Sequence, residues 1–266
     1  MTETDVSEVY KWFEDYADRF MAHTANNSSP GTMRAMMHLK REHSLRVAAE
    51  ARSLASDLGW NPEDQNAAEA LGLLHDTGRF SQMAEFGTFR DTDSVNHALR
   101  GYQVIRDEGV LRKHSLIREQ QILEGIRWHN GLRIPESLPA DHLLFIHLIR
   151  DADKLDIFLI FRDAFLHNRL QDYPEIIHHV DIEGPASADL LAEIQAKRVP
   201  SYRMIRSLND WKLLQISWAF DLHYRPTCQR VLQRGVLGSL ADLLSATEEI
   251  CAAIETAKSH LKSRCA

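Results

Sequence analysis

Apolar residues recur with a helical period along almost the whole 266-residue chain. Strand-like alternation is rare, and the 12 glycines and 8 prolines lie between the periodic segments. We expect helices over residues 6–21 and 36–58, from 62 toward 78, from about 94 through 97, from 115 to about 130, and over 141–165, 209–224, 227–234 and 239–263. The pattern therefore predicts an all-α protein.

Local signals place the ends of several helices. Gly59 is expected to stop the second helix and Gly78 the third, because glycine favours the conformation that ends a helix. Helix N-caps are expected at Asn61, which precedes a proline, at Asp93 or Ser94, and at Ser115. Loops or irregular structure are expected over residues 26–31, 81–93, 134–140 and 171–200.

Composition narrows the function classes. Hydrophobic residues make up 44% of the chain and the formal net charge is −7, so the whole chain has no electrostatic reason to bind a nucleic-acid polymer. The three cysteines, Cys228, Cys251 and Cys265, form no paired motif, which favours a reducing compartment. No signal-peptide pattern is seen, and Leu143–Ile149 is too short to cross a bilayer. We expect a cytoplasmic, soluble protein with no membrane partner.

The chain contains 14 histidines, and several stand beside carboxylates on or at the ends of predicted helices. Five segments stand out: Glu42-His43-Ser44, His75-Asp76-Thr77-Gly78-Arg79, Asn96-His97, Trp128-His129-Asn130-Gly131 and Asp151-Ala152-Asp153-Lys154-Leu155-Asp156. Imidazole nitrogens and carboxylate oxygens together suit Mn, Fe, Co, Ni or Zn. One such histidine on an apolar helix is more often an ordinary core or surface residue than a ligand.

The adjacent pair His75-Asp76 is the most informative. Neighbouring residues at a helix terminus point in directions about 100° apart. One side chain can therefore bind one ion while the other reaches a second ion. A carboxylate has two oxygens and can bridge two metals, which an imidazole does not do in this way.

The order His…His-Asp…His…His…Asp resembles the HD-domain superfamily of metal-dependent phosphohydrolases. The resemblance lies in Glu42–Ala48, in Leu73–Arg79 and in Ala152–Asp156, and it covers roughly His43 to Asp156. It implies an HD-domain helical bundle with additional C-terminal helices. We expect a metal-binding core with an N-terminal helix over residues 1–170 and a helical extension over 171–266, packed together as one structural unit.

The resemblance also implies a ligand set for one or two divalent ions, whether Mn, Fe, Co, Ni, Mg or Zn. The first ion would be held by His43, His75, Asp76 and Asp153, and the second by Asp76, His97 and His129. The segment 122–131 looks like its counterpart in HD enzymes that cleave symmetrical dinucleoside tetraphosphates. The HD-GYP branch usually has two consecutive histidines where His129-Asn130 stands here, which argues against that branch.

The expected activity is hydrolysis of a small phosphate ester by water that a metal activates, and a nucleotide is the favoured substrate. Asp76, Arg79 and Lys154 are the candidate catalytic residues, the two cations because each stands beside a ligand and can contact phosphate. Asp156 lies one turn after Asp153, so it is expected to orient a ligand histidine. Arg46 is interpreted as a salt-bridge residue.

Two other classes of function remain open. Some HD-fold proteins use the same ligand order to hold two irons and activate oxygen, and the residues here are compatible with that chemistry. A non-enzymatic nucleotide sensor with a degraded site is the third hypothesis, and the intact ligand order argues against it. The substrate, the native metal and the oligomeric state are not specified by any motif.

Overall fold

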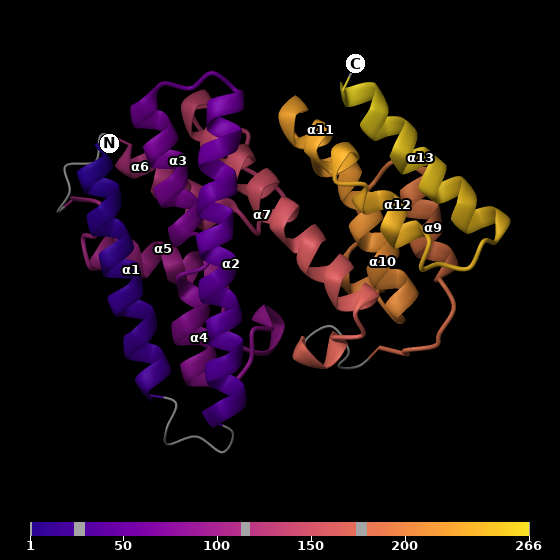
Figure 1. Ribbon diagram of the computed structural model, residues 1–266, viewed down its shortest axis with the longest axis horizontal. Coiled ribbons are helices and arrows are strands. Elements are labelled where there is room, and N and C mark those ends of the chain that lie inside the picture. The colour runs from indigo at the N-terminus through magenta and orange to yellow at the C-terminus, as the bar shows by residue number, and fades with distance from the viewer. Residues whose placement is uncertain (1, 24–29, 113–117, 174–179, 266) are drawn as a thin grey trace. The chain divides into compact units, whose positions relative to one another are not determined.

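The computed structural model describes residues 2–23, 30–112, 118–173 and 180–265. Within these ranges all regular structure is helical, and the one β-type pairing is an isolated bridge between Asp181 and Ser207. The predicted all-α class is confirmed (Figure 1). The chain divides into two compact units, Met1–Asp156 and Ile157–Ala266.

The first unit is built around one long helix, α2 (Pro30–Asp57). Its elements are α1 (Glu3–His23), α2, α3 (Pro62–Leu74), α4 (Gly78–Phe86), the 3₁₀ helix η2 (Asp91–Asp93), α5 (His97–Asp107), α6 (Glu119–Trp128) and the first part of α7 (Ala140–Leu166). Helices α1, α3 and α4 all contact α2, and Figure 1 labels the four helices. Gly72 lets α3 approach α2 closely, because a Cβ at this position would lie 2.7 Å from the Ala48 Cα.

The start of α3 follows the predicted signal. Asn61 is the N-cap, its side chain accepts a hydrogen bond of 2.9 Å from the Asp64 amide, and Pro62 opens the helix. The helix ends with His75 as its C-cap, and a short turn leads into α4. This turn places His75 and Asp76 at one helix end.

The prediction that Gly78 ends a helix was wrong, and so was the predicted loop over residues 81–86, whereas residues 87–90 are irregular as expected. Gly78 begins α4, and residues 81–86 belong to that helix. The glycine is needed for packing, because a Cβ there would lie 2.1 Å from the His97 carbonyl oxygen and 2.7 Å from the Gly101 nitrogen. The helix ends instead at Gly87, whose φ of 66° is easily adopted by glycine alone.

Other helix ends also differ from expectation. Helix α2 begins at Pro30, so the last two residues of the predicted loop 26–31 are helical, while 26–29 lie outside the described residues. Asn96, and not Asp93 or Ser94, caps α5 by accepting a hydrogen bond of 2.9 Å from the Leu99 amide. Ser115 lies outside the described residues.

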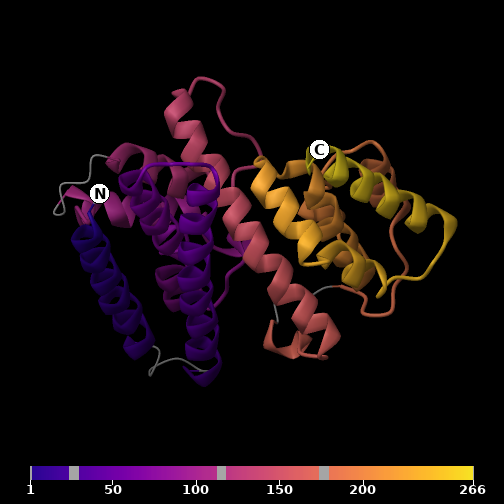
Figure 2. The same cartoon turned by 45° about the horizontal axis from the view of Figure 1, so that its top comes forward.

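The second unit contains the end of α7 and the C-terminal helices. These elements are η4 (Leu170–Asp172), α9 (Ala188–Gln195), η5 (Tyr202–Met204), α10 (Leu208–Ser217), η6 (Trp218–Asp221), α11 (Arg225–Gln233), α12 (Val236–Ala241) and α13 (Glu248–Cys265). Helix α13, yellow in Figure 2, packs against α9, α11 and α12. Ser207 and Asp210 form a capping box at the start of α10.

Three expectations for this unit were wrong. The stretch 171–200 contains α9, the predicted helix 209–224 ends at Ser217 and continues as η6, and the predicted helix 239–263 is divided into α12 and α13. The apolar spacing continues from Leu240 to Ile254 across a non-helical segment, so periodicity alone joined two helices. None of the described helices combines the length and apolar character that crossing a membrane requires.

We predict that Gly78→Ala destabilises the protein by about 3 kcal/mol, because the new methyl group overlaps the main chain of α5. Urea unfolding measures the change. Gly31→Ala is the matched control, since a Cβ there meets nothing within 4 Å and should leave stability unchanged or raise it by about 0.5 kcal/mol. Equal stability of the two variants would contradict this account of the packing.

Candidate metal centre

The six predicted metal ligands lie together in the first unit. His43 lies in α2, His75 is the C-cap of α3 and is followed by Asp76, His97 is the first residue of α5, His129 is the C-cap of α6, and Asp153 lies in α7. All are buried except Asp153, whose side chain is 19% exposed. The ends or interiors of five helices that are far apart in sequence thus bring these side chains together.

The first group of ligand atoms lies between α2, α3 and α7. The Nε2 atom of His43 is 3.1 Å from Asp153 Oδ1, and that of His75 is 3.7 Å from the same oxygen. Asp76 Oδ2 is 3.8 Å from each of the two Nε2 atoms. Donor atoms of His43, His75 and Asp153 are close enough to one another to hold a single ion.

The second group lies on the other side of Asp76. Asp76 Oδ1 is 3.3 Å from His97 Nε2 and 3.7 Å from His129 Nε2, and these two nitrogens are 3.0 Å apart. His75, Asp76 and His129 also offer donor atoms with the spacing of an ion site. One oxygen of Asp76 therefore faces each group, which is the arrangement of a bridging carboxylate.

The outer nitrogen of each histidine fixes its tautomer. The Nδ1 atoms lie 2.7 Å from Asp156 Oδ2 for His43, 2.7 Å from the Gly72 carbonyl for His75, 2.8 Å from Asp91 Oδ2 for His97 and 2.8 Å from the Ile126 carbonyl for His129. Each partner only accepts hydrogen bonds, so Nδ1 carries the hydrogen. In the neutral rings all four Nε2 atoms are therefore lone-pair donors that face the centre.

Metal ions fit this set of donors. The Nε2 atoms of His43 and His75 and the Oδ1 atom of Asp153 are buried, and none has a hydrogen-bond partner among the described residues. Buried acceptors that face each other without a hydrogen or a cation between them are costly. Divalent cations satisfy nitrogen and carboxylate lone pairs together.

Burial and charge shift the ionisation of these groups. Burial lowers the pKa of His75 to about 4, and burial together with the Arg79 guanidinium lowers that of His97 to about 3. Burial also acts to lower the pKa of His43, but the nearby carboxylates of Asp153 and Asp156 outweigh burial and raise the pKa. A bound metal ion would compete with the proton on His43.

Lys40 was missed by the sequence analysis. Its Nζ atom is 2.9 Å from Asp76 Oδ2, and its side chain is 22% exposed, so it reaches both the centre and solvent. Its charge helps hold the pKa of Asp76 well below the ordinary value, against the opposing effect of burial. Lys40 precedes His43 by three residues on α2, and this helical spacing is the signal that could have found it.

Two carboxylates stand behind the histidines. Asp156, expected to orient a ligand, accepts from His43 and also forms an ion pair with Arg46, whose Nε is 2.7 Å from Asp156 Oδ1. Asp91 pairs with His97 and was missed, because it lies in the expected loop 81–93 with no helical relation to any ligand. Only the folded arrangement of η2 brings it to His97.

The two candidate phosphate-binding cations differ in their surroundings. The Nη1 atom of Arg79 donates to the Phe89 carbonyl, to Gln82 at 3.0 Å and to Asp91 at 3.1 Å, and the side chain is 15% exposed. Its Nε is 3.5 Å from Asp76 Oδ1. Lys154 is half-buried beside Asp153, and its Nζ is 3.4 Å from the Arg150 carbonyl.

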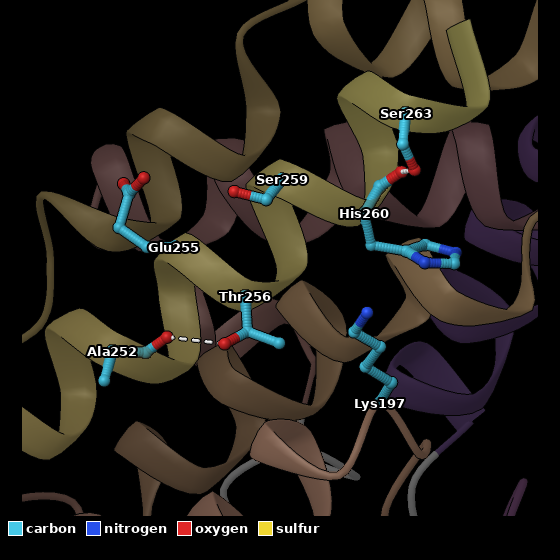
Figure 3. A pocket seen from close by; sticks show the side chains of 7 residues that line it. All are labelled: Lys197, Ala252, Glu255, Thr256, Ser259, His260 and Ser263. Atoms are coloured by element: carbon cyan, nitrogen blue, oxygen red, sulfur yellow. Dashed lines mark hydrogen bonds between the residues drawn. The ribbon is translucent and has the colours of Figure 1, made fainter.

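The second unit has a surface pocket of about 450 Å³ along α13 (Figure 3). It is lined by Lys197, Ala252, Glu255, Thr256, Ser259, His260 and Ser263, and none of the predicted site residues takes part. Thr256 donates to the Ala252 carbonyl at 2.9 Å, and Ser263 to that of His260 at 2.7 Å. These hydroxyl hydrogens are used by the helix itself, so the pocket has no arrangement comparable to the centre in the first unit.

Comparison with known families agrees with the geometry. The model of the HD domain matches residues 41–157. The chain therefore carries an HD domain over these residues, and its buried His and Asp cluster is consistent with the metal site of such domains. Neither the curated proteins nor the solved structures compared with the chain gave a match.

We predict that the metal-free protein loses stability as the pH falls from about 6.5 toward 4. His75 and His97 have lowered pKa values of about 4 and 3 in the folded protein against 6.5 when unfolded. The unfolded chain therefore binds more protons in this window, which favours unfolding. His43 acts with the opposite sign, because its raised pKa contributes stability below 6.5 that is lost as the pH rises above it.

Urea unfolding of chelator-treated protein at several pH values measures the effect. His97→Asn should show a shallower loss, because one of the two buried imidazoles no longer titrates. A stability that is flat or rises on acidification across this window would rule out the neutral, buried histidines.

Proposed function

We propose that the protein is a metal-dependent phosphohydrolase that cleaves a phosphomonoester, phosphodiester or phosphoanhydride of a nucleotide-like substrate. The observation that carries the proposal is the division of Asp76, with Oδ2 facing His43 and His75 and Oδ1 facing His97 and His129. HD domains are typical of metal-dependent phosphohydrolases, which supports the reaction class.

The ligand roles in this proposal follow the two groups. His43, His75, Asp76 and Asp153 would hold one divalent ion, and Asp76, His97 and His129 would hold the second. Ions at these positions supply Lewis acidity, which lowers the pKa of a water ligand toward neutrality and offsets negative charge on phosphoryl oxygens. The histidines contribute neutral lone pairs, because their Nδ1 hydrogens are held by fixed acceptors.

The cations around Asp76 support a substrate with phosphate groups. Lys40 lies at the centre and reaches solvent, so its ammonium can donate to a phosphoryl oxygen. Lys154 follows Asp153 on α7 and is assigned the same kind of contact. Arg79 already donates to several protein groups, so in this scheme it contributes mainly positive charge next to Asp76.

We predict metal-dependent release of phosphate or nucleoside from at least one member of a panel of phosphate esters, nucleotides, dinucleoside polyphosphates and cyclic nucleotides. The protein is stripped of metal and resupplied with Mn²⁺. Asp76→Ala should abolish turnover, because it removes ligand atoms from both groups. Asp93→Asn, at an exposed carboxylate paired with Arg90, is the matched control and should retain activity.

No turnover on any phosphate compound by folded, metal-loaded protein would contradict the proposal. Iron-dependent oxygen consumption by the same protein would instead favour the di-iron oxygenase, which the same ligand order can support.

We predict that Lys40→Met lowers kcat/KM about 10-fold or more, because a charged hydrogen bond to the phosphoryl group is lost. Steady-state kinetics on the best substrate of the panel measures the loss. Lys40→Arg should recover part of it, and Lys11→Met, on the exposed side of α1, should leave the rate unchanged. Wild-type kinetics in Lys40→Met would remove Lys40 from the site.

A further inference from the structure

Asp91 joins three helices around the second group of ligand atoms. Its Oδ2 and Oδ1 lie 2.8 and 2.9 Å from His97 Nδ1. Oδ1 also accepts from Gln82 Nε2 at 2.9 Å and from Arg79 Nη1 at 3.1 Å, both on α4. Oδ2 accepts from Asn130 Nδ2 at 3.1 Å, just after α6. One carboxylate in η2 thus accepts hydrogen bonds from α4, from the start of α5 and from the segment after α6.

The segment that carries Asp91 is itself fixed by a buried side chain. Gln82 is fully buried, and its Nε2 lies 2.9 Å from Ser94 Oγ and 3.0 Å from the Val95 carbonyl in addition to its contact with Asp91. The position of the carboxylate is therefore set by the packed side of α4. Such a fixed acceptor holds the plane of the His97 ring and keeps its hydrogen on Nδ1.

The first group of ligand atoms has a separate support. Asp156 accepts from His43 Nδ1 at 2.7 Å and from Arg46 Nε at 2.7 Å. Asp91 and Asp156 share no hydrogen-bond partner within the described part of the chain. Each half of the centre thus has one carboxylate that orients one ligand histidine.

We propose that Asp91 is a positioning residue that determines whether the second metal ion is bound, while the first position is held independently of it. The inference rests on the proposed two-ion centre and deepens it. His97 meets Asp76 Oδ1 and His129 Nε2 through its inner nitrogen, so a small rotation of the ring separates it from both. The other histidine of that half, His129, is oriented by a main-chain carbonyl and does not depend on Asp91 in this way.

The test counts metal ions in Asp91→Asn. Asparagine keeps the size of the side chain, but it places an amide nitrogen where one acceptor oxygen stood. That nitrogen would face the hydrogen-bond donors that surround the carboxylate in the wild-type protein. We expect elemental analysis after equilibration with Mn²⁺ to fall from two ions per chain to one. Calorimetric titration should show that the affinity of the weaker Mn²⁺-binding step is reduced by about 10- to 100-fold. The magnetic-resonance signal of a coupled Mn²⁺ pair should be replaced by that of an isolated ion.

Two further variants make the test specific. Asp93→Asn lies in the same short helix, and its 49% exposed carboxylate is paired with Arg90, so it should keep two ions. Asn130→Ala removes one contact of Asp91 from an exposed position and should weaken the same step to a smaller degree, which provides a readout if Asp91→Asn does not fold.

Two ions bound with wild-type affinity by folded Asp91→Asn would overturn the proposal, as would an equal loss in Asp93→Asn. A wild-type protein that binds a single ion would also overturn it, because no second position would exist. That outcome leaves the phosphohydrolase proposal to its own assay, since phosphate release with one ion remains measurable. A wild-type protein that binds two ions but releases no phosphate would count against the function and not against the role of Asp91.

Discussion

The first unit depends on a group of buried nitrogen and oxygen lone pairs that have no hydrogen-bond donor between them. The four histidines turn their Nδ1 hydrogens outward to carbonyl and carboxylate oxygens, which leaves only acceptor atoms facing Asp76 and Asp153. Burying acceptors in this way is unfavourable unless a positive charge lies among them. Lys40 supplies part of that charge by its contact with Asp76. A metal ion held among these atoms would therefore also stabilise the fold of this unit.

The helices supply the precision of the centre mainly through their ends. His75 and His129 are C-caps and His97 opens α5, so three ligands stand where the backbone direction changes and the side chains converge. The outer nitrogens of His75 and His129 are held by carbonyls three residues earlier in the same chain segment, which is a local arrangement. Only His43 and His97 need a carboxylate from elsewhere, and this is why each has its own.

The sequence predicted the six candidate ligands that lie together in the first unit and one of the two carboxylates behind them, Asp156, but not Asp91. His43, His75, Asp76 and Asp153 were proposed as ligands because each belongs to a short motif that resembles an HD-domain segment, and the prediction that the chain around them is helical is confirmed. Asp91 was not found, because its relation to His97 exists only after η2 has folded against Gln82.

Several predicted helix ends were wrong for a different reason, because the same residue type can serve more than one structural role. Gly78 was interpreted as a helix terminator, yet its lack of a side chain serves the contact with α5 and it begins a helix. In the second unit, apolar spacing on either side of residues 242–247 has the same period, so it did not reveal the break between α12 and α13. The hydrophobic period indicates which face of a helix is buried, but it is less informative about where the helix ends.

The contact between Gly78 and Gly101 has a consequence for how this protein can change over evolutionary time. A Cβ on Gly101 would lie 3.2 Å from the Gly78 nitrogen, so α4 and α5 meet main chain to main chain. While both positions remain glycine, no side chain lies between the two helices at this point, so the closeness of α4 to α5 here does not depend on side-chain volume. Apolar side chains elsewhere in the unit can be exchanged for others of similar volume, whereas a side chain at position 78 would push the start of α5, which carries His97, away from the segment that carries Asp76.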